Sequence, residues 1–168
     1  VYEAGGVAVA VGGGVDLTGV ISQGCTPVGQ SWTITRAERN LIQELGGRPA
    51  YEILARTFQE LSPEEQQRAR GNLFVGLVVD EYQEEFQRGD FLVRSLLGVD
   101  PRSGALAVGA LPRAGQTLQF QRRDAASASE DLRKLLRQAR ARLTGRAIYG
   151  GFLCCCNGRG QSLFGTPN

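Results

Sequence analysis

Short links rich in glycine and proline separate the apolar segments of this chain, and they constrain its fold more than any other feature of the sequence. Residues 12–14 are three consecutive glycines, and residues 100–104 read Asp-Pro-Arg-Ser-Gly. Links of this length suit hairpins and turns, whereas a parallel crossover needs a dozen or more residues. We therefore expect an α+β fold in which helices pack on a mostly antiparallel sheet.

Hydrophobic patterning assigns the expected strands. Alternating or continuous apolar runs bounded by turn residues indicate strands, and such runs cover residues 7–11, 15–22, 31–35, 40–44, 72–79, 90–97, 105–108, 116–122 and 147–155. Residues 24–29, Gly-Cys-Thr-Pro-Val-Gly, are bounded by glycine and contain a proline. We expect this segment to be a turn.

The expected helices show apolar residues at helical spacing and cover residues 49–61, 62–71 and 127–144. Ser62 with Glu65 matches the capping-box pattern at the start of the second helix, and Ser127 with Glu130 repeats it at the start of the third. The expected buried face of the third helix consists of Leu132, Leu135, Leu136, Ala139 and Leu143.

The first apolar run has no obvious cover within the chain. Residues 7–11 read Val-Ala-Val-Ala-Val, and a continuous apolar run of this kind is typical of a strand buried on both faces. The chain contains no methionine. We expect the sheet to be incomplete at its N-terminal side, the neighbours of this strand to lie partly upstream, and the sequence to be a fragment.

Composition excludes several function classes. The 168 residues carry a net charge of +2, which gives no overall attraction to nucleic acid, and the arginines of the third helix have no interleaved aromatic residues. There is no histidine, so the chain alone cannot build a Ser-His-Asp or Cys-His catalytic arrangement. No apolar run is long enough for a membrane-spanning helix. We expect neither membrane insertion nor nucleic-acid binding.

The cysteines do not form a metal motif. They are Cys25 and the consecutive Cys154, Cys155 and Cys156. Consecutive residues of a strand point to alternating faces, so the triplet cannot close a tetrahedral zinc site, and no Cys-x-x-Cys spacing is present. We expect reduced thiols in a cytoplasmic protein, with no metal and no cofactor.

The C-terminal part of the chain carries its most specific signal. An apolar strand is followed by three cysteines and by the turn Cys156-Asn157-Gly158-Arg159-Gly160, after which the chain ends in Ser-Leu-Phe-Gly-Thr-Pro-Asn. Such a turn directs backbone N–H groups and one guanidinium toward a common space, which suits an anion. This run resembles the end of the FIST domain family, a sensory module of intracellular signalling proteins.

The resemblance extends over most of the chain and also includes residues 24–29, 45–50, 89–94 and 98–100. It implies that residues 1–35 are the C-terminal tail of the FIST N-terminal half and that residues 36–168 are the FIST C-terminal domain. Gly46 stands where the family commonly has an aspartate, so the role of that carboxylate does not carry over to this chain.

The resemblance implies a cytoplasmic, non-catalytic sensory domain. It would bind a small ligand, such as an amino acid or another small anion, and signal to a partner protein or an attached output domain. One alternative is a thiol-dependent enzyme or redox sensor that uses Cys156, with Arg159 and Asn157 stabilising an anionic partner. Another is a protein-interaction scaffold.

The expected ligand-binding residues come from two glycine-rich turns and one strand, and they are Cys25, Pro27, Arg94, Cys156, Asn157, Arg159 and Gly160. Glycine lets the backbone approach a ligand closely, and arginine binds carboxylate or phosphate groups through paired hydrogen bonds. We expect the turns at 24–29 and 156–160 to lie together, with Arg94 beside them.

Each of these side chains also has an ordinary structural explanation. Arg94 sits among apolar strand residues and would form an internal ion pair with Asp90 or Glu85. Cys156 would be a small buried side chain at the end of a strand. Arg159 would cap a carbonyl group, and its flanking glycines would supply the positive φ of a turn.

Overall fold

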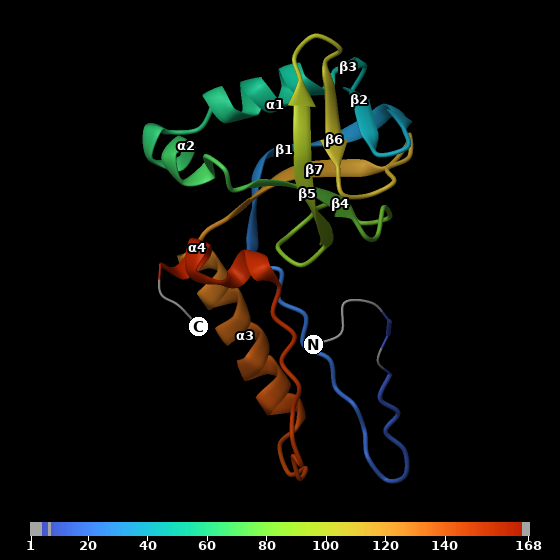
Figure 1. Ribbon diagram of the computed structural model, residues 1–168, viewed down its shortest axis with the longest axis vertical. Coiled ribbons are helices and arrows are strands. Elements are labelled where there is room, and N and C mark those ends of the chain that lie inside the picture. The colour runs from blue at the N-terminus through green and yellow to red at the C-terminus, as the bar shows by residue number, and fades with distance from the viewer. Residues whose placement is uncertain (1–4, 7, 166–168) are drawn as a thin grey trace.

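The computed structural model describes residues 5–6 and 8–165, and it has the expected α+β architecture (Figure 1). Its strands are β1 Cys25–Glu38, β2 Leu41–Leu45, β3 Arg48–Pro49, β4 Leu73–Val78, β5 Phe91–Asp100, β6 Ala105–Val108 and β7 Thr117–Arg123. Its helices are α1 Ala50–Gln59, α2 Pro63–Ala69, α3 Ala125–Arg142, the 3₁₀ turn η1 Asn157–Arg159 and α4 Gln161–Phe164.

The seven strands form one antiparallel sheet that closes on itself. Their order is β1-β7-β4-β5-β6-β2-β3, and β1 also pairs with β2, so that six strands make a ring. The 14-residue strand β1 serves both neighbours, because its first part pairs with β7 and its last part with β2. Irregularities in register let β1 bend between these partners. Ring closure leaves few free sheet edges.

The main core lies on one face of this sheet, beneath α1. It includes Ile34 of β1, Val75 of β4 and Phe120 of β7, which are fully buried. From α1, Ile53 and Leu54 join the same core. This helix begins directly after Pro49 and buries its apolar face, as the 3.6-residue period predicts.

The opposite face of the sheet is also covered around the start of β1. Cys25 lies directly opposite Arg123, and Pro27 lies opposite Gln121, so these four side chains share a face. Cys25 and Gln121 are buried. The Gln23 side chain accepts a hydrogen bond from the backbone N–H of Val93 in β5. The start of β1 therefore lies close to the start of β5.

Helix α3 follows β7 directly and extends away from the barrel, as Figure 1 shows. Its N-cap is Asp124, which accepts a hydrogen bond from the backbone N–H of Ser127. The expected capping box of Ser127 with Glu130 was wrong, because the helix begins two residues earlier. The Ser62–Glu65 capping box at α2 was confirmed.

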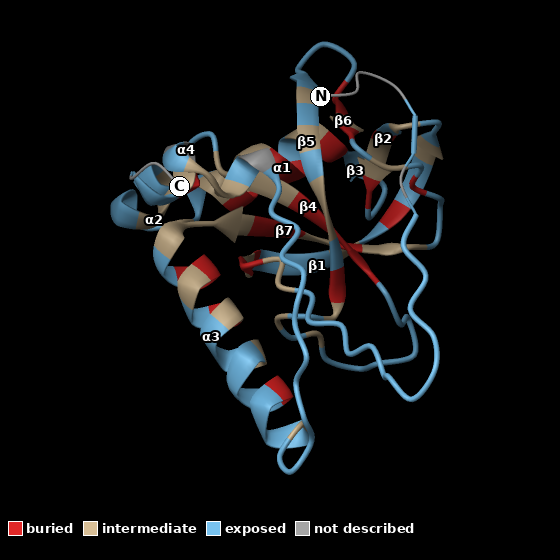
Figure 2. Cartoon of the chain, turned by 60° about the horizontal axis from the view of Figure 1, so that its bottom comes forward, coloured by how far each residue is buried: buried red, intermediate tan, exposed pale blue. Residues whose placement is uncertain are grey.

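The expected buried face of α3 was partly confirmed. Ala139 is buried and Leu132, Leu135 and Leu143 are partly buried, whereas Leu136 is about half exposed. Ala128 and Asp131, near the N-terminus of the helix, are also buried. Figure 2 shows the outer two thirds of α3 mostly in the colour of exposed residues.

Three expected strands are absent from the described residues. Segments 8–11, 15–22 and 147–155 are extended but have no strand partner, and Val7 lies outside the described residues. Apolar, β-branched sequence favours a strand only where another backbone supplies hydrogen bonds. The expected turn at 24–29 was also wrong, because residues 25–29 form the first part of β1 and pair with β7.

None of the helices in the described part of the chain combines the length and apolar character that a bilayer crossing requires.

Candidate functional site

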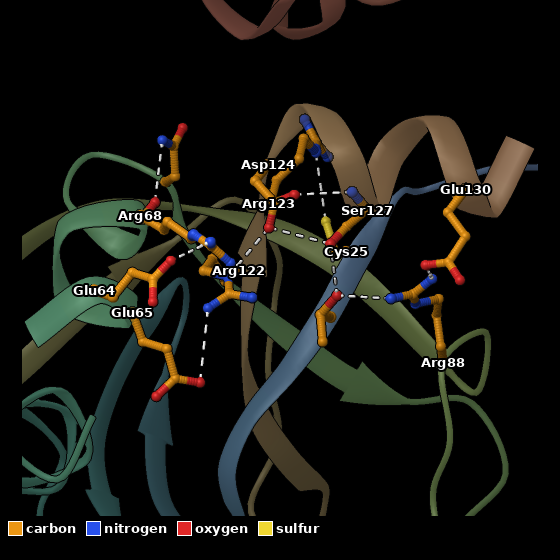
Figure 3. A network of polar contacts seen from close by, with 12 residues as sticks. Cys25, Glu64, Glu65, Arg68, Arg88, Arg122, Arg123, Asp124, Ser127 and Glu130 are labelled. Atoms are coloured by element: carbon orange, nitrogen blue, oxygen red, sulfur yellow. Dashed lines mark hydrogen bonds and ion pairs between the residues drawn. The ribbon is translucent and has the colours of Figure 1, made fainter. Parts of the chain in front are cut away.

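Four elements meet at the N-terminus of α3. The residues before β1, the end of β7, the first turns of α3 and the turn η1 bring together a group that we call the Cys25 cluster, which consists of Ser22, Gly24, Cys25, Arg123, Asp131 and Arg159. Figure 3 shows the part of this network around Cys25 and Arg123. The cluster joins segments that are more than 100 residues apart in sequence.

Asp131 and Arg159 form hydrogen bonds with the segment that precedes β1, from two sides. The buried Asp131 carboxylate accepts hydrogen bonds from the Ser22 hydroxyl at 2.6 Å and from the Gly24 backbone N–H at 3.1 Å. The Arg159 guanidinium donates to the Ser22 carbonyl and to the Ser22 hydroxyl, both at 2.9 Å. The segment Ser22–Gly24 is thus fixed between an acid on α3 and a cation on η1.

The Cys25 thiol is buried inside this cluster. It donates to the Gln23 carbonyl at 3.4 Å and accepts from Arg123 Nε at 3.4 Å. Burial raises the pKa of the thiol, and this effect exceeds the opposing effects of the Arg123 and Arg159 guanidinium groups, while Asp131 adds to the increase. Cys25 is therefore a protonated, protected thiol rather than a nucleophile.

Two glycines allow the arginines to approach. At Gly24, which has a φ of 64°, a Cβ atom would lie 2.5 Å from Arg159 Nη2 and 2.8 Å from the Ala128 backbone. At Gly158, a Cβ would lie 3.3 Å from Arg123 Nη1 and 3.8 Å from Cys156 Sγ. A side chain at Gly24 would displace the guanidinium of Arg159. The absence of a side chain at each glycine thus lets one guanidinium group lie close to the backbone there.

A second group of polar contacts extends the cluster along α3, as Figure 3 shows. The Arg88 guanidinium, from the loop before β5, donates to Thr26 Oγ1 at 2.9 Å and forms an ion pair with Glu130 at 3.2 Å. Thr26 in turn donates to the Ser127 hydroxyl at 3.1 Å. These contacts tie the β4–β5 loop, β1 and the first turns of α3 to one another.

The structure brings together most of the residues that the sequence singled out. Cys25 and Arg159 lie in the same cluster, and Cys156 lies next to Gly158 at its edge. Pro27 is the next residue on the Cys25 face of β1, and Gly160 is the N-cap of α4. The side chain of Asn157 and the residues 166–168 lie outside the described part of the chain.

Arg94 does not join this group. It lies opposite Val75 of β4, which lies opposite Phe120 of β7, so the three residues share the face of the main core. Cys25 points to the other face. The Arg94 guanidinium donates to the carbonyl of the neighbouring Val93 at 3.3 Å. Arg94 forms no ion pair with Asp90 or Glu85 among the described residues.

Four members of the site were missed at the sequence level, namely Ser22, Arg88, Arg123 and Asp131. Arg123 ends a strand in the run Gln-Arg-Arg-Asp, and Asp131 sits in the first turns of a helix. Both patterns are common in surface segments. Only the pairing of β7 with the start of β1 shows that they belong to one site.

The three consecutive cysteines differ from expectation. Cys154, Cys155 and Cys156 are exposed free thiols, whereas Cys25 is buried. The expectation that Cys156 is a small buried side chain was therefore wrong, because the strand that was to bury it does not form. Within the described residues, no group of three or more cysteine or acidic side chains is arranged to hold a metal ion.

Comparison with known proteins gives consistent matches along the chain. The family model described as FIST C domain matches residues 50–168, and the one described as FIST N domain matches residues 1–48. An uncharacterized protein of Mycobacterium tuberculosis is 43% identical over 155 residues, which are 92% of this chain and 40% of that protein.

An uncharacterized protein of Mycobacterium bovis is 45% identical over 149 residues, which are 89% of this chain and 38% of that protein. The chain thus spans about two fifths of the length of these relatives. No solved structure matches it.

Proposed function

This chain belongs to the FIST family, and we propose that it is part of a cytoplasmic sensory domain that binds a small ligand and signals to a partner protein or an attached output domain. FIST domains are associated with sensory signal transduction. The ligand in this proposal carries a carboxylate or phosphate group and binds at the Cys25 cluster. The proposal assigns binding, not catalysis, to this site.

The observation that carries the proposal is the convergence of two cations on one point. Arg123 and Arg159 both act electrostatically on the Cys25 thiol, although they come from different elements. Arginine guanidinium groups bind carboxylate and phosphate groups through paired, charge-assisted hydrogen bonds. Gly24 and Gly158 have no side chains of their own, so the guanidinium groups of Arg159 and Arg123 come close to the backbone there. Asp131 supplies a carboxylate close by, which suits the ammonium group of an amino acid.

Helix α3 offers a route from this site to a partner. Asp131, Ser127 and Ala128 of α3 contact the residues around Gly24 and Thr26. A ligand that exchanges hydrogen bonds with Ser22 or Gly24 would change the contacts of Asp131 and so bias the position of the helix. In this proposal, the partner recognises the ligand-bound state through the exposed outer part of α3.

A thermal-shift screen tests the proposal. The full-length polypeptide is titrated with free amino acids, small carboxylates and inorganic phosphate. A true ligand at a concentration of about 100 times its Kd adds about 2.7 kcal/mol of stability, which raises Tm by several degrees. We expect Arg159→Ala to weaken binding about tenfold or more, because hydrogen bonds to charged groups contribute roughly 1.5–3 kcal/mol.

Arg137→Ala is the matched control, because Arg137 is an exposed arginine on α3 outside the cluster. It should keep the full ligand-induced shift. An unchanged shift in Arg159→Ala would remove η1 from the site, and an equal loss in both variants would mean that the ligand binds through general charge alone.

A redox sensor is the second candidate, and the exposure of Cys156 favours it. A Cβ atom at Gly158 would lie 3.3 Å from Arg123 Nη1 and 3.8 Å from Cys156 Sγ, so Arg123 and Cys156 are neighbours. The rate of alkylation as a function of pH, measured with Cys154 and Cys155 replaced by serine, tests this candidate. Half-maximal reactivity at or above the ordinary thiol pKa of about 8.5 would argue against a sensing thiolate.

A further inference from the structure

Two extended apolar segments lie side by side outside the barrel. The first, residues 8–21, leads into β1, and the second, residues 147–153, follows α3. Both line one open hollow of about 850 Å³, and an ion pair between Asp16 and Arg146 joins them. In Figure 1 the second segment runs along α3, and Figure 2 shows it in the colour of exposed residues.

The large apolar side chains of both segments face solvent. Leu17 is 76% exposed, Ile21 83%, Tyr149 86% and Phe152 89%. Soluble proteins seldom leave so many neighbouring apolar side chains uncovered unless another polypeptide covers them. The surface formed by residues 8–21 and 147–153, which we call the apolar strand pair, is therefore an interaction surface.

The sequence pattern of this surface indicates what covers it. Ile148 and Tyr149 are adjacent, as are Phe152 and Leu153, so an extended chain here is apolar on both faces. Strands of this kind occupy the interior of a sheet that is covered on both sides. Their backbone groups have no strand partner among the described residues, and buried backbone groups must be hydrogen-bonded. The covering polypeptide must therefore contribute strands.

We propose that the apolar strand pair forms the inner strands of a second sheet, which polypeptide from outside these 168 residues completes. The matched regions are only 40% and 38% of the two relatives' length, so longer members of the family contain more chain than this domain uses. Strands from that additional chain pair with residues 8–21 and 147–153 and cover both of their faces.

A second copy of the chain suits this surface less well. Arg140 and Arg142 lie in the last turn of α3, and Arg146 borders the hollow. A two-fold contact uses the same surface of both copies, so the positive charge of Arg140 and Arg142 would be present on both sides of it. Like charges at a contact oppose association. Additional strands within the same polypeptide avoid this repulsion.

The inference does not rest on the proposed ligand. Both segments do, however, lead directly into the Cys25 cluster, since residues 8–21 continue into Ser22 and Gly24, and residues 147–153 continue into Cys156 and Arg159. The second sheet would fix the positions of these two segments and would border the cluster on the side away from the barrel.

Hydrogen exchange of the full-length polypeptide tests the inference. Strand pairing predicts that the amides of residues 147–153 exchange at least about 100-fold more slowly than in the 168-residue chain, because opening them requires local unfolding. The loop around Tyr82, which is 98% exposed, serves as the internal control and should exchange fast in both. Fast exchange at 147–153 in the full-length polypeptide would overturn the inference.

A charge substitution gives an independent readout. Phe152→Asp in the full-length polypeptide would place an unpaired carboxylate in a covered sheet, and we expect it to lower Tm by about 5 °C or more, or to abolish folding. Tyr82→Asp, the matched exposed control, should change Tm by less than about 1 °C. Equal effects would contradict the inference. So would a dimer of the 168-residue chain that itself protects residues 147–153, since the occupant would then be a second copy.

Discussion

The Cys25 thiol is surrounded by two guanidinium groups and one carboxylate, and these neighbours act on its pKa in opposite directions. Burial is the largest effect and keeps the thiol protonated, while Arg123 and Arg159 oppose it. Arg123 donates a hydrogen bond to the thiol and Arg159 donates to Ser22; in the proposed function an anionic ligand binds through these two guanidinium groups. This environment disfavours nucleophilic chemistry at Cys25, in line with the binding role that we propose for the cluster.

The raised pKa of Cys25 predicts a pH dependence of stability. The unfolded chain loses the thiol proton near the ordinary pKa of about 8.5, whereas the folded protein retains it to higher pH. The contribution is complete below that pH and is lost as the pH rises through the folded pKa. Denaturant unfolding between pH 7 and about pH 10 should show a steeper loss of stability in the wild type than in Cys25→Ala. Parallel profiles would contradict the assigned environment.

At the residue scale, sequence reasoning correctly placed Cys25 near Arg159, although residues 25–29 are a strand and not a turn, and it was wrong about the position of Arg94. Cys25 and Arg159 were recognisable because glycines flank both. The face to which Arg94 points depends on strand register, and a shift of one residue reverses it. That register is fixed by pairing with β4, which is not visible in the local sequence.

Helix α3 connects the site to the outer surface, and its N-terminus is stabilised by Asp124. Burial disfavours the ionised carboxylate, but hydrogen bonds from the Ser127 backbone N–H and hydroxyl, together with the positive charge of Arg122, hold the pKa of Asp124 below its usual range. The carboxylate also lies where the helix dipole favours a negative charge. The first turn of α3 is therefore well anchored.

Removal of this cap should destabilise the protein. Asp124→Ala is expected to cost about 1 kcal/mol, within the range of about 0.5–2 kcal/mol for N-cap losses. Because the folded pKa is lowered, the wild-type advantage is complete above the ordinary pKa of about 3.9 and disappears as the pH falls through the folded value. Urea unfolding at pH 7 and at successively lower pH values measures both effects.

Gln138→Ala is the control for this variant, because Gln138 is exposed in the middle of the same helix. It should change stability by less than about 0.5 kcal/mol. A loss in Asp124→Ala that persists unchanged at low pH would mean that packing, and not the ionised cap, causes the effect.

Among the elements, those with local signals were predicted well. Helices α1 and α2 and strands β4 and β6 lie within a few residues of their expected bounds. The segments 8–11, 15–22 and 147–155 carry equally strong strand patterns but remain unpaired among the described residues. A helix satisfies its own backbone, whereas a strand depends on a partner that can lie anywhere in the polypeptide.

The molecule as a whole is organised by the closure of its sheet. The β1–β2 and β1–β7 pairings place one long strand in both halves of the barrel, and the main core fills the space between them and α1. This closure was not predicted, because hairpin signals identify neighbours in sequence only. It also explains how residues far apart in the chain reach the Cys25 cluster.

The closed core predicts different effects for two leucines. Leu118 of β7 is fully buried, whereas Leu97 of β5 is 63% exposed. Leu118→Ala should cost about 2–5 kcal/mol, because it removes apolar contacts and leaves a cavity. Leu97→Ala should stay within about 0.5 kcal/mol. Chemical denaturation measures both, and equal costs would contradict the assignment of the core.

The central claim is that the two glycine-rich segments form one ligand site, and an NMR titration tests it most directly. The full-length polypeptide, labelled with ¹⁵N-glycine, is titrated with the ligand that the thermal-shift screen identifies. We predict that the Gly24 and Gly158 amide signals shift together and saturate with the same Kd, while Gly104, in the turn before β6, stays unmoved. A ligand that shifts only one of the two glycines, or neither, would contradict the account.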